Sequence, residues 1–119
     1  AVGINTLKAI TTGDNNTAIG NDALGANQYG SYNTAMGSHA LGTKHGIDSN
    51  PGSSYNTAMG CWSSASSVYA QYNTSVGFSS MLHNRNGNEN TAIGYYSLNE
   101  NYIKFRQKKR VTTSNSFFK

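Results

Sequence analysis

The stretch Thr12-Gly13-Asp14-Asn15-Asn16-Thr17-Ala18-Ile19-Gly20 decides the fold, because its last five residues return along the whole chain. Copies of this phrase, Asn-Thr-(Ala/Ser)-(Ile/Met/Val)-Gly, stand at residues 16–20, 33–37, 56–60, 73–77 and 90–94. The chain also opens on Ala1-Val2-Gly3, so six glycines mark the repeat, with spacings of 17, 17, 23, 17 and 17 residues. A fixed short period is typical of solenoids, in which each repeat forms one coil.

The composition also favours many short strands and turns. Of the 119 residues, 36% are hydrophobic and 12% charged, with thirteen glycines and one proline. Glycine permits tight corners, whereas proline would remove donors from strand ladders. We expect each coil to contain a short strand, a corner at the glycine, and a second short strand through the following Ala-Leu. The sequence therefore predicts an all-β fold, a parallel β-solenoid or β-roll of about six 17-residue coils.

Comparison of the repeats predicts which side chains stack. The invariant asparagines should hydrogen-bond into an amide ladder, as in other stacked β structures. These are Asn16, Asn33, Asn56, Asn73 and Asn90. The threonines after them should form a parallel column, and the tyrosines before three of them, at 32, 55 and 72, a short aromatic stack. We expect the aliphatic residue before each glycine to form a thin core.

Each repeated phrase has a small residue between its threonine and its aliphatic residue. We expect this column of small residues to form the contact surface, or seam, between chains. Ordering a residue costs about 1 kcal/mol or more, whereas a large buried side chain contributes on the order of 2 kcal/mol. With only two such side chains per coil, further burial is expected from association into a homotrimer. The predicted trimer seam consists of Ala18, Ala35, Ala58 and Ala92.

The repeated phrase followed by Ala-Leu, most complete at Thr12–Gly20, resembles repeats in tail or head fibres of phages and in surface proteins of large viruses. It is also similar to the head repeats of trimeric autotransporter adhesins, whose Ser-Val-Ala-Ile-Gly motif builds a left-handed parallel β-roll trimer. The resemblance covers residues 1 to about 98. It implies attachment or scaffolding and brings no catalytic residue to this chain.

Partner contacts are expected where the repeats differ. The position two residues after each glycine holds Asn5, Asp22, His39, Trp62, Ser79 and Tyr96. Trp62 and Tyr96 are candidate contacts, because Trp and Tyr are enriched at binding surfaces and sugars stack on such rings. Packing of Trp62 along the outer sheet, or in a subunit contact, is the alternative.

The six-residue insertion falls within residues 43–54 and carries the turn signal Asn50-Pro51-Gly52. Loops on rigid scaffolds often bind partners. Its candidate contacts are Lys44, His45 and Asp48. The insertion is explained equally well as a flap that stabilises the coil, or as the result of sequence drift without any function.

The sequence offers no pattern of a reactive site. A single cysteine, Cys61, excludes an intrachain disulfide, and the three histidines occupy different repeat positions. The acidic residues are scattered, which disfavours a paired-carboxylate glycosidase and calcium-binding repeats. We therefore expect no enzyme, cofactor or metal site. No apolar stretch approaches the roughly 20 residues of a membrane span.

The chain divides into a repeat domain, residues 1–103, and a basic C-terminal tail or transition segment, residues 104–119. The tail holds six of the nine basic residues and no acidic one. Basic tails of this kind can bind nucleic acid. We instead favour docking of the tail on a neighbouring fibre segment. Because the sequence begins within a repeat, we expect a fragment of a longer protein or a first coil covered by a partner.

The sequence thus predicts a non-enzymatic structural or adhesive component of a viral (phage) fibre, spike or virion decoration. It would act as a rigid rod on the virion surface, bound to other copies of itself, to other virion proteins and to a host-surface glycan or protein. The head of a bacterial trimeric adhesin on the cell surface is the alternative. An ice-binding solenoid is less favoured, because only one threonine column is regular.

Overall fold

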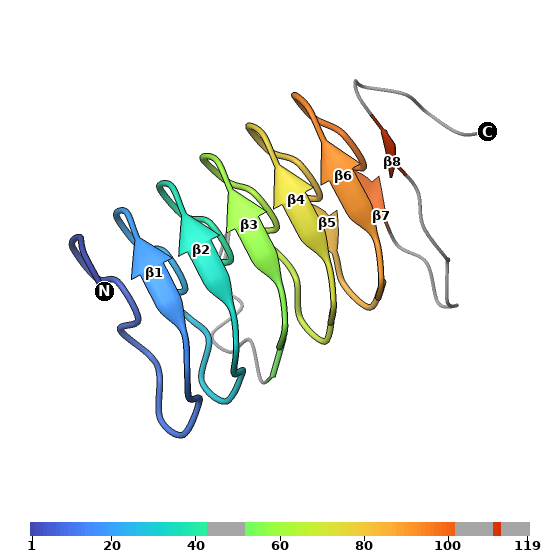
Figure 1. Cartoon of the computed structure of the whole chain (residues 1–119). Helices are drawn as coiled ribbons and strands as arrows, with labels where there is room; N and C mark the ends of the chain where they lie inside the picture. The colour runs from blue at the N-terminus through green and yellow to red at the C-terminus, as the bar shows by residue number, and fades with distance from the viewer. Residues whose placement is uncertain (43–51, 102–110, 113–119) are drawn as a thin grey trace.

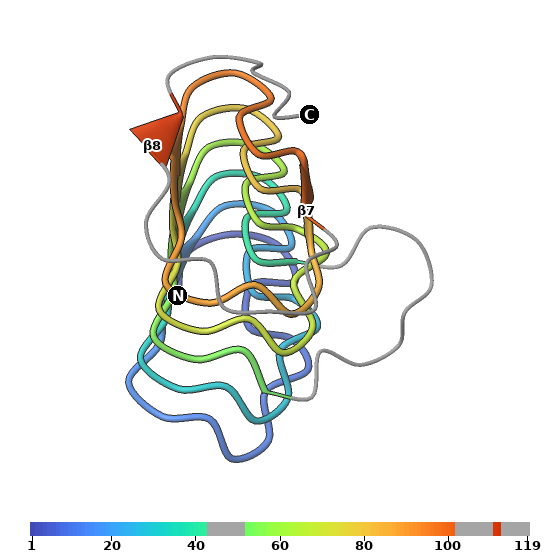
Figure 2. The ribbon, with the colours of Figure 1, turned by 90° about the vertical axis from the view of Figure 1, so that its right-hand side faces the viewer.

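The computed structural model describes residues 1–42, 52–101 and 111–112 and is an all-β solenoid. One parallel sheet contains β1 (Thr17–Ile19), β2 (Thr34–Met36), β3 (Thr57–Met59), β4 (Thr74–Val76), β6 (Thr91–Ile93) and β8 (Val111–Thr112). A second, two-stranded sheet contains β5 (His83–Asn84) and β7 (Glu100–Asn101). Successive coils stack along one axis (Figure 1), with β8 and β7 on opposite sides of the stack (Figure 2). The predicted stacked β-solenoid is confirmed.

Equivalent residues of successive repeats pair with one another from β1 to β6. Four turns of the solenoid separate these two strands. Thr17 pairs with Thr34, and Thr34 pairs with Thr57 across the 23-residue repeat. The insertion therefore leaves the sheet unchanged. The predicted contacts within it, Lys44, His45 and Asp48, lie outside the described residues. The sheet also continues into the predicted tail segment, because Val111 of β8 pairs with Thr91.

The glycine after each strand forms the predicted corner. Gly20 has a φ of +128°, and a Cβ there would lie 2.6 Å from the backbone carbonyl of Gly37 in the next coil. Only glycine fits such a φ and so close an approach. The second strand expected at Ala-Leu is wrong, however. Ala23 N–H donates to Gly20 and Gly25 N–H to Asp22, with positive φ at Asp22 and Leu24, so this segment is a tight turn.

The core lies on the opposite face of the sheet from the one predicted. Ala18 is 0% exposed, whereas Ile19 beside it is 41% exposed. The aliphatic column faces outward, and the interior holds the alanines together with leucines and Met81 that reach inward from the corner turns. The predicted trimer seam is therefore wrong, since its residues are fully buried within one chain. These are Ala18, Ala35, Ala58 and Ala92.

Hydroxyl groups replace apolar ones in part of this interior. Ser75 stands in the alanine column and Ser64 in the leucine column, and both are buried. The Ser75 hydroxyl contacts those of Ser63, at 2.6 Å, and Ser64, at 3.0 Å. Buried polar groups are tolerated when they are hydrogen-bonded. The serines that stand in place of the repeat's alanine and leucine therefore provide hydrogen-bond partners for one another.

The predicted amide ladder is confirmed. The Oδ1 atom of Asn56 accepts hydrogen bonds from the backbone N–H of Asn73, at 2.9 Å, and from its Nδ2, at 3.1 Å. The same pair of bonds joins every neighbouring pair of ladder residues: Asn16 with Asn33, Asn33 with Asn56, and Asn73 with Asn90. The ladder ties each coil to the next.

The predicted tyrosine stack is confirmed as well. The ring centroids of Tyr32 and Tyr55 lie 5.1 Å apart, and those of Tyr55 and Tyr72 lie 4.9 Å apart, with nearly parallel planes. Two buried asparagines, Asn27 and Asn84, were not anticipated. Each accepts a hydrogen bond from the glycine three residues later, which closes the loop before the next strand.

Enlarging an interior alanine should destabilise the fold. Ala58→Leu adds volume to a filled interior, and overpacking typically costs about 1–3 kcal/mol. We expect a loss of that size in the free energy of unfolding, measured by urea denaturation. Met59→Leu on the outward face of the same strand is the control and should change stability by less than about 0.5 kcal/mol. Equal losses would contradict the observed facing of β3.

Candidate functional site

A row of loops lies beyond the strand arrowheads (Figure 1). These loops carry the most varied side chains of the repeat. We call the residues one and two positions after each corner glycine the corner edge. It comprises Ile4, Asn5, Asn21, Asp22, Ser38, His39, Cys61, Trp62, Phe78, Ser79, Tyr95 and Tyr96. Its backbone is fixed between coils, since His39 N–H donates to Asn21 and Trp62 N–H to Ser38. Side chains of successive coils therefore lie next to one another.

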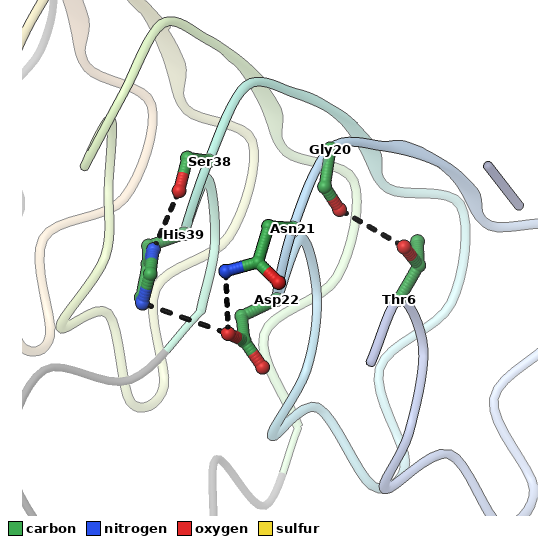
Figure 3. Close-up of polar contacts among 6 residues, drawn as sticks. All are labelled: Thr6, Gly20, Asn21, Asp22, Ser38 and His39. Atoms are coloured by element: carbon green, nitrogen blue, oxygen red, sulfur yellow. Dashed lines mark hydrogen bonds and ion pairs between the residues drawn. The ribbon is translucent and has the colours of Figure 1, made fainter. Parts of the chain in front are cut away.

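The corner edge is polar at residues 21–22 and 38–39 (Figure 3). Asn21 Nδ2 donates to Asp22 Oδ2 at 2.9 Å, and His39 Nε2 lies 3.7 Å from the same oxygen. The other ring nitrogen of His39 shares a hydrogen bond with Ser38 Oγ at 2.8 Å. One coil earlier, Thr6 donates its hydroxyl to the Gly20 carbonyl at 2.9 Å. Of these contacts, those of His39 with Asp22 and of Thr6 with Gly20 join neighbouring coils.

The Ser38, His39 and Asp22 side chains combine the residue types of a hydrolytic triad. Acyl transfer also needs a well-oriented base and free N–H donors for the oxyanion. The distance of 3.7 Å between Asp22 and His39 exceeds that of a hydrogen bond. The nearby N–H groups of Gly37 and His39 already donate to Ile19 and Asn21. In this arrangement the contact between Asp22 and His39 joins two successive coils.

The predicted contacts Trp62 and Tyr96 lie on the corner edge, and both are partly buried. The Trp62 indole stacks on the His39 imidazole, with ring centroids 4.0 Å apart and planes 25° apart. Between Trp62 and Tyr96 the same column holds Ser79, which is buried. The structure thus places the two aromatic residues on one edge, two coils apart.

Phe78 and Tyr95 complete an aromatic cluster that the sequence prediction missed. Their rings stack with centroids 5.6 Å apart, and Tyr96 packs against both, at 5.7 Å from Phe78 and 4.6 Å from Tyr95. Phe78 is 42% exposed and Tyr95 66% exposed. The signal available in the sequence was the aromatic pair at the same repeat position in two consecutive coils.

The outward face of the large sheet is the second surface with a regular pattern. We call its threonine and aliphatic columns on β1, β2, β3, β4 and β6 the sheet face. Ile19, Met36, Met59 and Ile93 are each about 40% exposed. None of these five strands contains a charged residue. The sheet face therefore presents apolar and hydroxyl groups at every coil.

Other kinds of site find little support in the part of the chain that the structure describes. No three His, Cys, Asp or Glu side chains in it come close enough to hold a metal ion. It includes no helix with the length and apolar character that crossing a bilayer requires. The chain matches no protein-family model, no curated protein and no solved structure.

Proposed function

We propose that this chain is a non-enzymatic, rigid rod segment of a viral fibre, spike or virion decoration that supports attachment to a host or to other virion proteins. The observation that carries the proposal is the strict register of the coils, in which equivalent residues of successive repeats pair from β1 to β6. Stacked coils of this kind form a stiff scaffold that presents corner loops at fixed intervals. The repeat resemblance favours a virion over a bacterial cell surface, which is the alternative location.

The rod is proposed to work as a homotrimer of about six coils per chain, joined through the sheet face. This surface repeats at the strand spacing of about 4.8 Å. A partner that covers the aliphatic residues of every coil must have the same axial period, and another copy of this chain has it. The absence of charge on these strands removes the cost of desolvating ions in a seam. The sheet face thus takes the role first assigned to the buried alanines.

Native mass spectrometry of the purified chain tests this proposal. One chain has a mass of 12.7 kDa, and we expect a trimer of about 38 kDa. Met59→Asp places a charge at the centre of the sheet face and should give monomers, because an unpaired buried carboxylate is costly. Tyr69→Asp is the control at an exposed position outside the strands of the sheet face and should leave the trimer intact. A monomeric natural chain, or a trimer that survives Met59→Asp, would contradict the proposed seam.

An ice-binding solenoid is the second candidate function. The observation in its favour is that Thr17, Thr34, Thr57, Thr74 and Thr91 stand in register on the outward face of a parallel sheet. The neighbouring column is aliphatic rather than a second threonine column, which weakens this candidate. Thermal hysteresis of a monomeric chain would support ice binding over the trimeric rod.

A further inference from the structure

We propose that the aromatic end of the corner edge, formed by Phe78, Tyr95 and Tyr96, binds a neutral oligosaccharide. This inference rests on the proposed attachment function and names the chemical class of its ligand. Sugar rings combine an apolar C–H face with a rim of hydroxyl groups. A surface that binds them needs exposed aromatic rings in a fixed orientation and polar side chains nearby.

The three rings meet the first requirement. Tyr95 and Phe78 stack at 5.6 Å with planes 16° apart, and Tyr96 contacts Tyr95 edge-on at 4.6 Å. Ring pairs of this geometry stabilise one another, so the cluster loses little freedom when a ligand binds. Tyr95 nevertheless remains 66% exposed and Phe78 42% exposed. The ring surface is thus held in place and available to a sugar C–H face.

The polar part of the corner edge meets the second requirement. Asp22, Ser38 and His39 place a carboxylate, a hydroxyl and an imidazole along the same row of loops (Figure 3). A chain of sugar units lying along the rod would pass from the aromatic rings towards these groups. Trp62, stacked on His39, lies between the two parts.

Charge and backbone pairing narrow the class of ligand. The corner edge carries the Asp22 carboxylate and includes no lysine or arginine, so this edge offers sulfated or sialylated glycans no lysine or arginine partner. A peptide strand could not extend the edge, because N–H groups of Asp22, His39 and Tyr96 already donate to the preceding coil. A neutral, hydroxyl-rich polymer remains the best match.

Isothermal titration calorimetry with cellohexaose, chitohexaose and mannohexaose tests the inference on the full chain. Trp62 is the only tryptophan, so its fluorescence provides a second readout on the same edge. We expect at least one of these hexasaccharides to bind and to change the Trp62 emission. Tyr95→Ala should weaken that binding about tenfold, in line with the loss of one aromatic contact.

Tyr69→Ala is the matched control, because Tyr69 is 60% exposed but lies outside the corner edge. It should leave the affinity unchanged. Binding to none of the three probes would overturn the inference, and so would binding that Tyr95→Ala leaves intact or that Tyr69→Ala weakens equally. The native mass of the same samples is an independent measurement, so loss of the trimer and loss of sugar binding can be told apart.

Discussion

Gly60→Ala is expected to remove most of the stability of the fold. Gly60 has a φ of +127°, and a Cβ there would lie 2.5 Å from the carbonyl oxygen of Gly77 in the next coil. A non-glycine residue in such a conformation costs about 1–3 kcal/mol, and the backbone of the next coil must also move. We expect the free energy of unfolding to fall by about 4 kcal/mol or more, out of the roughly 5–15 kcal/mol typical of a domain. Urea denaturation followed by circular dichroism measures this loss.

Gly52→Ala is the control for this substitution. A Cβ at Gly52 would meet no atom of the described residues within 4 Å, and the φ of Gly52 lies outside the left-handed region. The variant should be within about 0.5 kcal/mol of the natural chain, or slightly more stable, because alanine restricts the unfolded state. If both variants lost the same stability, contact between corner glycines of successive coils would not be the cause.

The stacked columns could be predicted from the sequence because a solenoid is nearly one-dimensional. A residue that returns every coil contacts its own copies, so invariant asparagines imply an amide ladder and repeated tyrosines imply a ring stack. Asn56 and Tyr55 behave in this way. No assumption about the packing of distant segments is needed for such contacts.

The facing of each strand could not be predicted in the same way. Alternation requires Ala18 and Ile19 to point to opposite sides, but it does not say which side is inside. The answer depends on the corner, where Asp22 and Leu24 both adopt positive φ and direct Leu24 into the interior. Leucine gives no signal of this conformation, which is rare for non-glycine residues.

The candidate site was predicted in part for a related reason. Trp62 and Tyr96 were found because their column varies between repeats. The stack of Phe78 on Tyr95 lies within one column and could be predicted from the sequence. The contact of Tyr96 with both rings could not, because it joins adjacent columns and depends on side-chain directions at the corner. The link between Asp22 and His39 likewise requires the coil geometry.

Asn56→Ala is the second substitution with a large expected effect. Asn56 is buried at the centre of the amide ladder. Its Nδ2 donates to the Ala70 carbonyl at 2.8 Å, and its Oδ1 accepts from the Asn73 backbone at 2.9 Å. Truncation leaves both backbone groups without these partners, at about 1–3 kcal/mol each. We expect the free energy of unfolding to fall by about 2–6 kcal/mol in urea denaturation.

Asn90→Ala is the matched control, since it removes the same atoms near the C-terminal end of the ladder. Asn90 Nδ2 donates to Asn73 Oδ1 at 3.1 Å, but its own buried Oδ1 has no hydrogen-bond partner among the described residues. Its truncation should therefore cost only about 1 kcal/mol, the net value of one hydrogen bond. A loss as large as that of Asn56→Ala would mean that cavity formation, which is the same in both variants, outweighs the ladder. A clear difference would instead show that the loss in the free energy of unfolding follows the number of hydrogen bonds removed and not the number of atoms removed. Pairing between coils would then stabilise each turn through its neighbour.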